Sequence, residues 1–453
     1  MIQYAPFNMS MELKEWQRPL AEHQTRVLRE GRVMLSACHT GSGKTYIACQ
    51  TIKDLGMPTL VVCPKVAISQ WRSVVDGMGC SQYVIDVINP ERLVAGKNAY
   101  YSSKDGWLSF NGVRPDKDPM LLVFDEVHRG ASGIESKQTM MAARWCSRLH
   151  PLNKALLMSA TPFETPEKMR LIGYLMGFHR FVKSSFYDWM RTKNCGYVDI
   201  GWGRSRRRIF RFTTNRRVAE ATMRGIREEM GDRFMSITPD EIPGFPEETR
   251  EVVRIDLSKR DHDKLVRAYE EMPDRIQRMS EDDMVKMLRL RQQAEFCKAE
   301  AVAQEIVEAV KSGYSVFRMV NFTDARIRLE NCLRDVKIPF ANIYGGQRDS
   351  ERQRGIDEFQ ANQVHVMVGM AAACSVALSL HDERHERPRV SWISPGYSAS
   401  EFSQGLGRIR RVGGTPVTQF IDIAAGSVEE KVGMAIERKM AALEALTDQD
   451  FLR

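Results

Sequence analysis

The sequence predicts an α/β protein of two domains, each built on a mostly parallel sheet with helices on its faces. Its 453 residues exceed what one hydrophobic core usually organises, so two to three domains are expected. Short apolar runs alternate with helix-patterned stretches in both halves, which is typical of strands joined by crossover helices. A proline-rich segment near the middle separates the two halves.

In the first half, four short apolar runs are the predicted strands of one sheet. They cover 33–37, 59–63, 120–124 and 155–158 and precede glycine or acidic residues. The stretch from Thr45 to Leu55 has the spacing of a helix. Because open parallel sheets bind ligands at the carboxyl ends of their strands, we expect functional residues directly after these runs.

The proline-rich segment 238–246 is the predicted boundary between the domains, because its three prolines fit neither a helix nor a central strand. We therefore expect one domain over 1–240 and another over 241–453. The second half has an alternating run at 251–257 and helical sequence to about residue 311. Strand-like runs then follow at 316–320, 364–368 and 390–393, which predicts a second α/β domain.

The charge balance favours a polyanionic partner. Lys plus Arg number 66 against 58 Asp plus Glu, which gives a net charge of +8, and such a surplus suits phosphate groups. The nine cysteines are scattered and form no C-x-x-C pair, so they indicate neither a zinc site nor a disulfide framework.

No apolar stretch approaches the roughly 20 residues that span a bilayer, and the start of the chain lacks the pattern of a signal peptide. We expect an intracellular, cytoplasmic protein without a membrane partner, or one of the host cytoplasm for a viral chain.

A glycine-rich loop follows the first predicted strand and precedes the first helix. Such a loop lets backbone amides surround phosphate oxygens, while a lysine reaches the outer phosphates and a hydroxyl holds Mg²⁺. This is a Walker A loop, in which Cys38 stands where the strict pattern has glycine. The predicted ATP-binding residues of the loop are Thr40, Gly41, Ser42, Gly43, Lys44 and Thr45.

Two adjacent carboxylates, Asp125 and Glu126, end the third apolar run. Phosphoryl transfer to water needs one acid in the Mg²⁺ shell and one that orients the attacking water. We expect Asp125 and Thr45 to hold the metal ion, and Glu126 to act on the water.

Three ordered motifs resemble those of superfamily 2 helicases and translocases. Asp-Glu-Val-His at 125–128 is similar to motif II, Ser-Ala-Thr at 159–161 to motif III, and Gln-Gly-Leu-Gly-Arg-Ile-Arg-Arg at 404–411 matches motif VI. The resemblance implies two tandem RecA-like domains and hydrolysis of ATP. It further implies that Gln404 contacts ATP and that Arg408 and Arg411 are catalytic, Arg411 as the arginine finger on the transferring phosphate.

Weaker similarities to the same superfamily extend over much of the chain. Gln24 resembles the upstream glutamine that contacts adenine, and Lys65 and Trp71 fall in a segment similar to motif Ia, which contacts nucleic acid. At 371–380 the chain departs from motif V, because alanines occupy the usual threonine position and a glycine position. The coupling that motif V provides is therefore in doubt.

Two branches of the superfamily compete, and both act on DNA. The stretches 251–258 and 288–292 resemble Snf2-like double-strand translocases, whereas Ser-Ala-Thr and Gly407 resemble the branched-DNA helicases of phage and repair type. We expect a monomeric motor that remodels duplex or branched DNA, of phage, viral or repair type. The alternatives are a Snf2-like translocase without strand separation, a motor subunit that serves a partner, and an RNA helicase.

Seven arginines lie within 14 residues between positions 204 and 217, interleaved with Phe210 and Phe212. Arginines beside aromatic rings suit phosphate contact and base stacking. The alternative is a solvated amphipathic face. We expect nucleic acid to contact Arg206, Arg207, Arg208 and Arg211.

Overall fold

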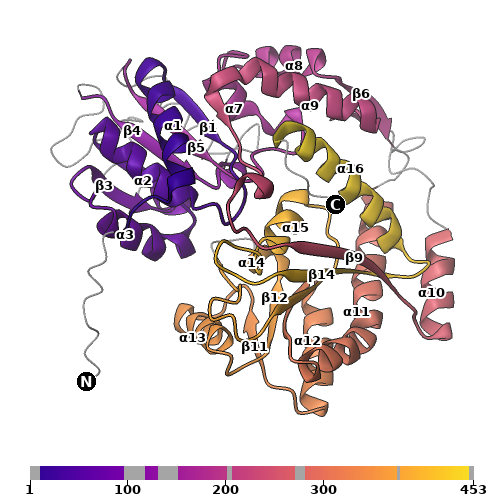
Figure 1. The fold of residues 1–453 in the computed structure, drawn as a ribbon. Helices are drawn as coiled ribbons and strands as arrows, with labels where there is room; N and C mark the ends of the chain where they lie inside the picture. Colours follow the sequence, from indigo (N-terminus) through magenta and orange to yellow (C-terminus); the bar gives the residue numbers. More distant parts are fainter. Residues whose placement is uncertain are drawn as a thin grey trace, which may run out of the picture. The chain divides into compact units, whose positions relative to one another are not determined.

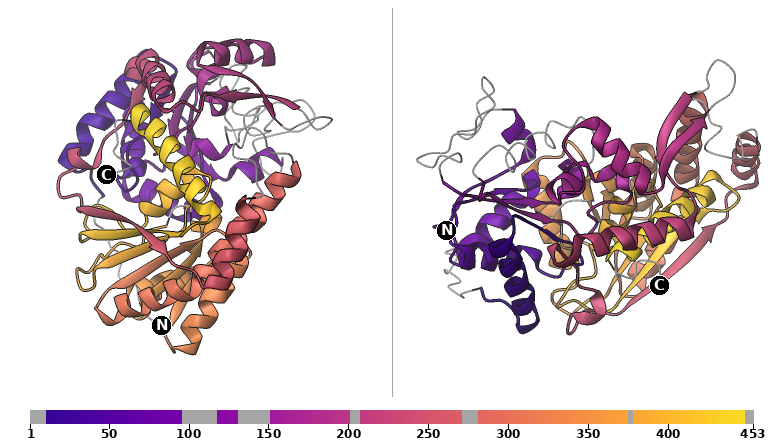
Figure 2. Two further views of the ribbon diagram at one scale, coloured as in Figure 1. Left: turned by 90° about the vertical axis from the view of Figure 1, so that its right-hand side faces the viewer. Right: turned by 90° about the horizontal axis from the view of Figure 1, so that it is seen from above.

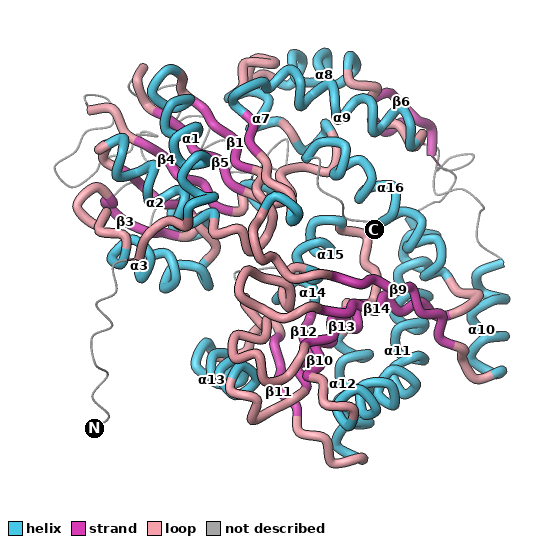
Figure 3. The backbone as a smooth tube through the Cα atoms, viewed as in Figure 1, coloured by secondary structure: helices cyan, strands magenta, loops and turns pink. Residues whose placement is uncertain are grey.

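The strands of the chain gather into two six-stranded parallel sheets and one two-stranded sheet (Figure 1, Figure 3). These come from a computed structural model that describes residues 11–95, 118–130, 151–200, 207–270, 281–374 and 378–447. The architecture confirms the predicted α/β class with two mostly parallel sheets flanked by helices, as in tandem RecA-like domains.

The first sheet has the strand order β3-β2-β4-β5-β1-β8, and its neighbouring strands pair in parallel. The four predicted runs all form strands of this sheet, and the short strands β3 and β8 at its two edges are additional. The strands are β1 (Val33–Ser36), β2 (Thr59–Val62), β3 (Val84–Ile88), β4 (Leu121–Asp125), β5 (Lys154–Met158) and β8 (Phe234–Met235).

Helices α1 and α3 of the first half contact strands of this sheet. Helix α1 buries Ala21, Val27 and Leu28, and α2 follows the phosphate loop directly. The helices are α1 (Arg18–Glu30), α2 (Lys44–Leu55), α3 (Ile68–Gly77), α4 (Pro90–Val94), α5 (Val127–Gly130), α7 (Arg170–Leu175), α8 (Lys183–Thr192) and α9 (Arg216–Met230).

The second sheet has the order β11-β12-β10-β13-β14-β9 and is also parallel. Its core strands are buried on both faces, as continuous apolar runs predict. The strands are β9 (Glu248–Ile255), β10 (Ser315–Val320), β11 (Phe340–Ile343), β12 (Val366–Met370), β13 (Arg389–Ile393) and β14 (Val417–Ala424).

Helices α11 and α12 lie side by side against one face of the second sheet (Figure 2). Ala303 and Ile306 of α11 and Leu329 of α12 pack there against Val316 and Val366. The helices of this half are α10 (Lys259–Glu270), α11 (Glu281–Lys311), α12 (Thr323–Asp335), α13 (Asp349–Gln360), α14 (Ala371–Cys374), α15 (Ala399–Leu406) and α16 (Val428–Thr447). In the part of the chain that the structure describes, no helix is both long and apolar enough to cross a membrane.

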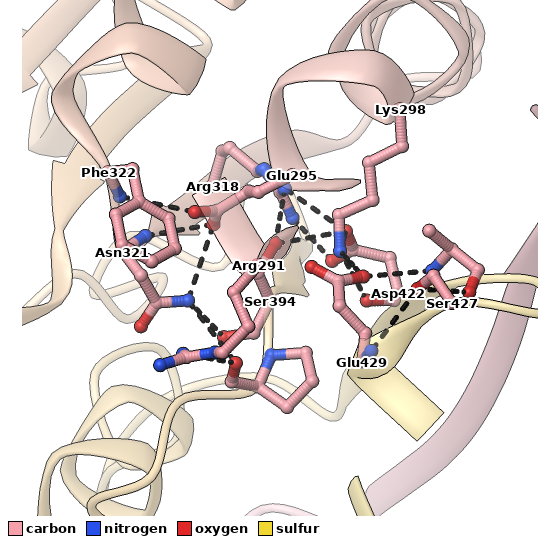
Figure 4. A network of polar contacts seen from close by, with 12 residues as sticks. Arg291, Glu295, Lys298, Arg318, Asn321, Phe322, Ser394, Asp422, Ser427 and Glu429 are labelled. Atoms are coloured by element: carbon pink, nitrogen blue, oxygen red, sulfur yellow. Dashed lines mark hydrogen bonds and ion pairs between the residues drawn. The ribbon is translucent and has the colours of Figure 1, made fainter. Parts of the chain in front are cut away.

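A buried ionic network ties α11 to the second sheet (Figure 4). The Nζ atom of Lys298 lies 2.9 Å from a carboxylate oxygen of Asp422 and 2.6 Å from one of Glu429, and Arg318 pairs with Asp422 as well. One carboxylate oxygen of Glu295 accepts from the backbone N–H of Asn321 at 2.8 Å. Because these charges are buried, they compensate one another and fix the helix, strand and loop that carry them.

The chain divides into two compact units, one formed mainly by 1–195 and 217–243 and the other mainly by 196–216 and 244–444. The boundary between the units at 243/244 falls within the proline-rich segment 238–246. Residues 196–216, which contain most of the arginine cluster, group with the second unit, whereas the sequence analysis placed them in the first domain. The domain bounds 1–240 and 241–453 remain a prediction.

Candidate nucleotide site

The phosphate loop leaves β1 and enters α2 through two glycines in left-handed backbone conformation. Gly41 has φ of 87° and Gly43 of 76°, a region that strains other residues. The Nζ atom of Lys44 donates to the carbonyl oxygens of Cys38 at 2.9 Å and His39 at 3.2 Å, so it stays over the loop. Thr40 and Thr45 are partly exposed on either side of it, whereas Ser42 is buried. The loop has the shape that phosphate binding needs.

Gln17, which the sequence analysis overlooked, braces this loop. Its Nε2 donates to the carbonyl oxygen of Ser42 at 2.9 Å, and its Oε1 accepts from the backbone N–H of Lys14 at 3.0 Å. A Cβ atom on Gly43 would lie 2.4 Å from the same Nε2, so a larger residue there would displace the Gln17 amide from the loop. Gln17 belongs to the short 3₁₀ helix η1 (Glu15–Gln17) that precedes α1.

Gln24 is buried between two helices. Its side chain is 1% exposed and donates to the hydroxyl of Thr51 at 3.0 Å, which joins α1 to α2. This burial disfavours the expected adenine contact at Gln24, which remains a prediction. The spacing of Gln24 to Ala21 and Leu28, which lie on the same buried stripe, is the sequence signal that indicated this burial.

Asp125 ends β4 with both carboxylate oxygens held. Oδ2 accepts from the indole Nε1–H of Trp71 at 2.8 Å, and Oδ1 accepts from the backbone N–H of Glu126 at 3.0 Å. Burial raises the pKa of Asp125 to about 6, with a further rise from the Glu126 charge that the Trp71 hydrogen bond and the Lys44 charge only partly oppose. The carboxylate is thus held in one orientation, and its charge is only partly balanced by nearby positive charge, as is expected of a ligand for a cation.

Glu126 lies in left-handed conformation, with φ of 53°, and contacts motif III. Its Oε2 is 3.2 Å from Nδ1 of His128 and 3.5 Å from the hydroxyl of Ser159. Nδ1 of His128 is also 2.8 Å from the Ser159 hydroxyl, and the backbone N–H of Thr161 donates to the same hydroxyl at 3.1 Å. Because β4, β5 and β1 are parallel neighbours, the sheet brings Ser159 to the edge where Glu126 and the phosphate loop lie.

The two residues of the predicted motif Ia contact lie in different surroundings. Lys65 is exposed at the start of the 3₁₀ helix η2 (Lys65–Ala67). Trp71 of α3 is 1% exposed, and its indole N–H donates to Asp125. This burial disfavours the expected contact of Trp71 with nucleic acid, which remains a prediction.

The donor set fits Mg²⁺ bound together with a nucleotide. Asp125 offers carboxylate oxygens and Thr45 a hydroxyl, which are hard ligands of the kind that Mg²⁺ prefers. Within the described ranges, no group of three or more His, Cys, Asp or Glu side chains could hold a metal ion by itself. Phosphate oxygens and water would therefore complete the shell, as is usual for Mg²⁺ with nucleotides.

Two arginines of motif VI in the second unit donate to the same backbone carbonyl. Arg408 and Arg411 both donate to the carbonyl oxygen of Leu378, at 3.0 Å and 2.8 Å. Arg408 is 2% exposed and Gln404 1%, whereas Arg411 is partly exposed. Burial therefore disfavours a direct phosphate contact by Arg408 and Gln404 and leaves Arg411 as the better candidate.

The atypical motif V lies partly outside the described residues, since 375–377 are not described. Ala371 and Cys374 of α14 are buried, and the hydroxyl of Ser379 lies 2.8 Å from Nδ1 of His381. Burial lowers the pKa of His381 to about 4, and the nearby Arg411 charge adds to this. Ser379 thus serves a local contact with a neutral imidazole.

Arg207, Arg208 and Arg211 of the arginine cluster lie on β7 (Arg207–Phe212), which pairs with β6 (Cys195–Ile200) in a two-stranded sheet. Arg208 and Arg211 are exposed, and the Arg208 guanidinium lies 5.6 Å from the ring centre of Tyr197. Tyr197, itself 53% exposed, meets the ring of Phe210 edge to face at 5.0 Å. Arg206 lies outside the described residues, and Arg207 begins β7.

The first-unit motifs all fall within residues 10–164, which match the family model described as type III restriction enzyme, res subunit. With the ordered motifs and the relative named next, this match confirms the resemblance to superfamily 2. The chain is similar to the ATP-dependent helicases of that superfamily.

More particularly, the chain is 27% identical over 466 residues to a protein of Acanthamoeba polyphaga mimivirus that carries the provisional name ATP-dependent RNA helicase. The alignment covers 97% of this chain and 84% of the viral protein. A solved structure, the Sulfolobus solfataricus SWI2/SNF2 ATPase core in complex with dsDNA, is 16% identical with a TM-score of 0.38, covering 96% of this chain and 92% of that one. At that TM-score the likeness supports no conclusion about this chain.

Proposed function

We propose that this chain is an ATP-driven motor that remodels duplex or branched DNA. The observation that carries the proposal is the placement of Lys44, Asp125 and Glu126 at the carboxyl edge of one parallel sheet, where such sheets bind their ligands. A lysine over a phosphate loop and two adjacent carboxylates are what Mg²⁺-assisted hydrolysis of ATP requires.

The residues take separate roles in this proposal. Lys44 neutralises the outer phosphates, and Thr45 and Asp125 hold Mg²⁺, which supplies Lewis-acid polarisation of the phosphates when bound. Glu126 orients the attacking water and is itself held by Ser159 and His128. In place of Gln24, Gln17 is proposed beside the nucleotide, because it contacts the phosphate loop.

Arg411 is proposed as the arginine finger of the second unit. Its guanidinium is partly exposed and donates to the carbonyl oxygen of Leu378 at 2.8 Å, and a charged phosphate oxygen is a stronger acceptor than a carbonyl. Arg408 and Gln404 are proposed to support it from the buried interior of motif VI. Arg411→Ala should reduce turnover more than ATP affinity, since a finger acts chiefly on the transition state.

DNA is proposed as the substrate because the motif II and motif VI strings differ from the D-E-A-D and H-R-x-G-R-x-x-R forms typical of RNA helicases. The family model, which is named for a restriction enzyme subunit, agrees with this. RNA is the second candidate, because the mimivirus relative is named as an RNA helicase. We propose that the chain acts as a monomer on DNA.

Exposed basic groups supply the proposed nucleic-acid contacts. Lys65 of η2 stands at the end of β2, and Arg208 and Arg211 stand on the β6–β7 sheet with the exposed ring of Tyr197. Guanidinium groups suit phosphates, and an exposed aromatic ring suits base stacking.

The direct test is ATP turnover in the presence of duplex DNA, forked DNA, single-stranded DNA or RNA. We expect duplex or forked DNA to stimulate turnover most, and Lys44→Ala to abolish it with every nucleic acid. Stimulation by RNA alone would favour the second candidate. Normal turnover by the Lys44 variant would refute the nucleotide site.

The contact through the arginine cluster has its own test in the salt dependence of DNA affinity. Changing Arg206, Arg207, Arg208 and Arg211 to Ala should flatten the slope of log affinity against log salt by about 0.7 to 0.9 per lost contact. A matched control changes Arg26 and Arg191, exposed arginines of α1 and α8. An unchanged slope in the folded quadruple variant would assign the cluster to a solvated face.

A further inference from the structure

We propose that Trp71 is a positioning residue for the metal ligand Asp125, and that its indole N–H fixes which carboxylate lone pairs remain for Mg²⁺. The inference rests on the proposed function, because it takes Asp125 as a ligand of Mg²⁺. It assigns to a buried tryptophan a part in cation binding that the sequence pattern, which suggested nucleic-acid contact, did not indicate.

The contact is directional and specific. Nε1 of Trp71 donates to Oδ2 of Asp125 at 2.8 Å across 54 residues of sequence, and the Trp71 side chain is 1% exposed. The indole nitrogen can only donate, so it holds an acceptor without competing for a cation. Helix α3 places the ring, and β4 places the carboxylate.

The second oxygen of Asp125 is also held. Oδ1 accepts from the backbone N–H of Glu126, whose left-handed conformation turns the chain sharply after the strand. Two donors from two different elements therefore fix the carboxylate plane. Each oxygen keeps a further lone pair, so a cation can bind without either hydrogen bond breaking.

Positioning of this kind acts on metal affinity. Removing a group that orients a metal ligand typically lowers metal affinity about 10- to 100-fold. Without its N–H donor, the Asp125 side chain could rotate about its Cα–Cβ bond, and the orientation suited to the ion would be less populated. Nucleotide binding without metal does not involve this orientation and should change little.

The test compares the affinity for a non-hydrolysable ATP analogue in excess Mg²⁺ and in EDTA, by titration calorimetry on the full chain. For wild type we expect Mg²⁺ to strengthen binding. For Trp71→Phe, that enhancement should fall about tenfold or more, while the dissociation constant in EDTA stays within about twofold.

The matched control is Trp189→Phe. Trp189 of α8 is 8% exposed and stacks on Phe178 and Phe186, and its Nε1 has no hydrogen-bond partner among the described residues. This variant loses the same atoms from a buried aromatic cluster without touching Asp125. It should keep the full Mg²⁺ enhancement.

A second variant guards against a folding defect at position 71. Benzothienylalanine incorporated there replaces the N–H by sulfur and preserves the shape of the ring, so it should behave like Trp71→Phe. Full Mg²⁺ enhancement in either folded variant would overturn the positioning role. Absence of Mg²⁺ enhancement in wild type would overturn the assignment of Asp125 in the proposed function, which is a distinguishable failure.

Discussion

Two buried aspartates, Asp125 in the first unit and Asp422 in the second, respond to burial in opposite ways. Burial raises the pKa of Asp125 to about 6, because Trp71 and Lys44 offset the effect only in part. Burial also acts on Asp422, but the charges of Arg318 and Lys298 outweigh it and lower the pKa of that carboxyl. Both carboxylates lie on strands of parallel sheets.

The difference separates a carboxylate that is available to a ligand from one that is part of the structure. Asp422 receives two cations and the hydroxyl of Ser394, so its charge is satisfied within the chain (Figure 4). Asp125 receives hydrogen bonds from Trp71 and Glu126 but no ion pair from any residue that the structure describes, and a bound cation would balance its charge. Perturbed carboxylates of the second kind are typical of functional sites.

The largest expected effect is on stability in the second unit. Lys298→Met should destabilise the fold by about 3 to 5 kcal/mol, because it leaves Glu429 buried without its cation and Asp422 with one cation instead of two. Urea unfolding measures this. The matched control is Lys311→Met on the same helix, whose exposed pair with Glu308 should contribute about 0 to 1 kcal/mol. Equal losses of stability in the two variants would mean that the buried network contributes no more to stability than an exposed ion pair.

In the first unit, Asp125→Asn should affect ATP turnover and not stability, unlike Lys298→Met. We expect ATP turnover to fall roughly 100-fold or more, because the metal ion loses its charged ligand. Stability should change little, because the single amide oxygen accepts from either Trp71 or the Glu126 N–H but not from both, and removal of a buried charge offsets the lost hydrogen bond. Steady-state turnover and thermal unfolding measure the two effects. A loss of stability like that of the Lys298 variant would show that Asp125 is structural.

The pH dependence of stability should have opposite signs at the two aspartates. The folded-state pKa of Asp125, about 6, lies above its ordinary value of 3.8, so folding favours its protonated form. Its charged form destabilises the fold above about pH 6, and this penalty is relieved as pH falls toward about 4. The lowered pKa of Asp422 instead gives stability that is present above the ordinary value and lost as pH falls through the folded-state pKa.

Urea unfolding of wild type and Asp125→Asn across this range isolates the first contribution. The stability of the variant relative to wild type should be highest near about pH 7 and should fall as pH falls through about 6. A difference between variant and wild type that is independent of pH would contradict the raised pKa of Asp125.

The smallest effects should come from two buried serines that serve the two regions. Ser159→Ala removes the hydroxyl between Glu126 and His128. It should raise the activation free energy of ATP hydrolysis by about 1 kcal/mol, which lowers turnover roughly fivefold. Ser394→Ala removes a donor to Asp422 and should reduce stability by a similar amount at unchanged turnover. Turnover and urea unfolding of both variants provide the comparison, and an exchange of the two phenotypes would contradict it.

The sequence by itself determined the strands of the first sheet and the chemistry at their ends. Apolar runs such as 120–124 are long enough for a strand buried on both faces, and this local pattern needs no knowledge of the rest of the fold. The same holds for the phosphate loop, since only glycine readily adopts the backbone that Gly41 and Gly43 require.

Only the tertiary structure decided which partners the polar side chains have. Trp71 and Asp125 are 54 residues apart, and Lys298 and Asp422 are further apart still, so strand order and helix packing bring them together. Gln17 and Gln24 lie seven residues apart with the same side chain, yet one reaches the phosphate loop and the other is buried between helices. Hydrogen bonds and charge compensation depend on distance in space, which a local sequence pattern does not contain.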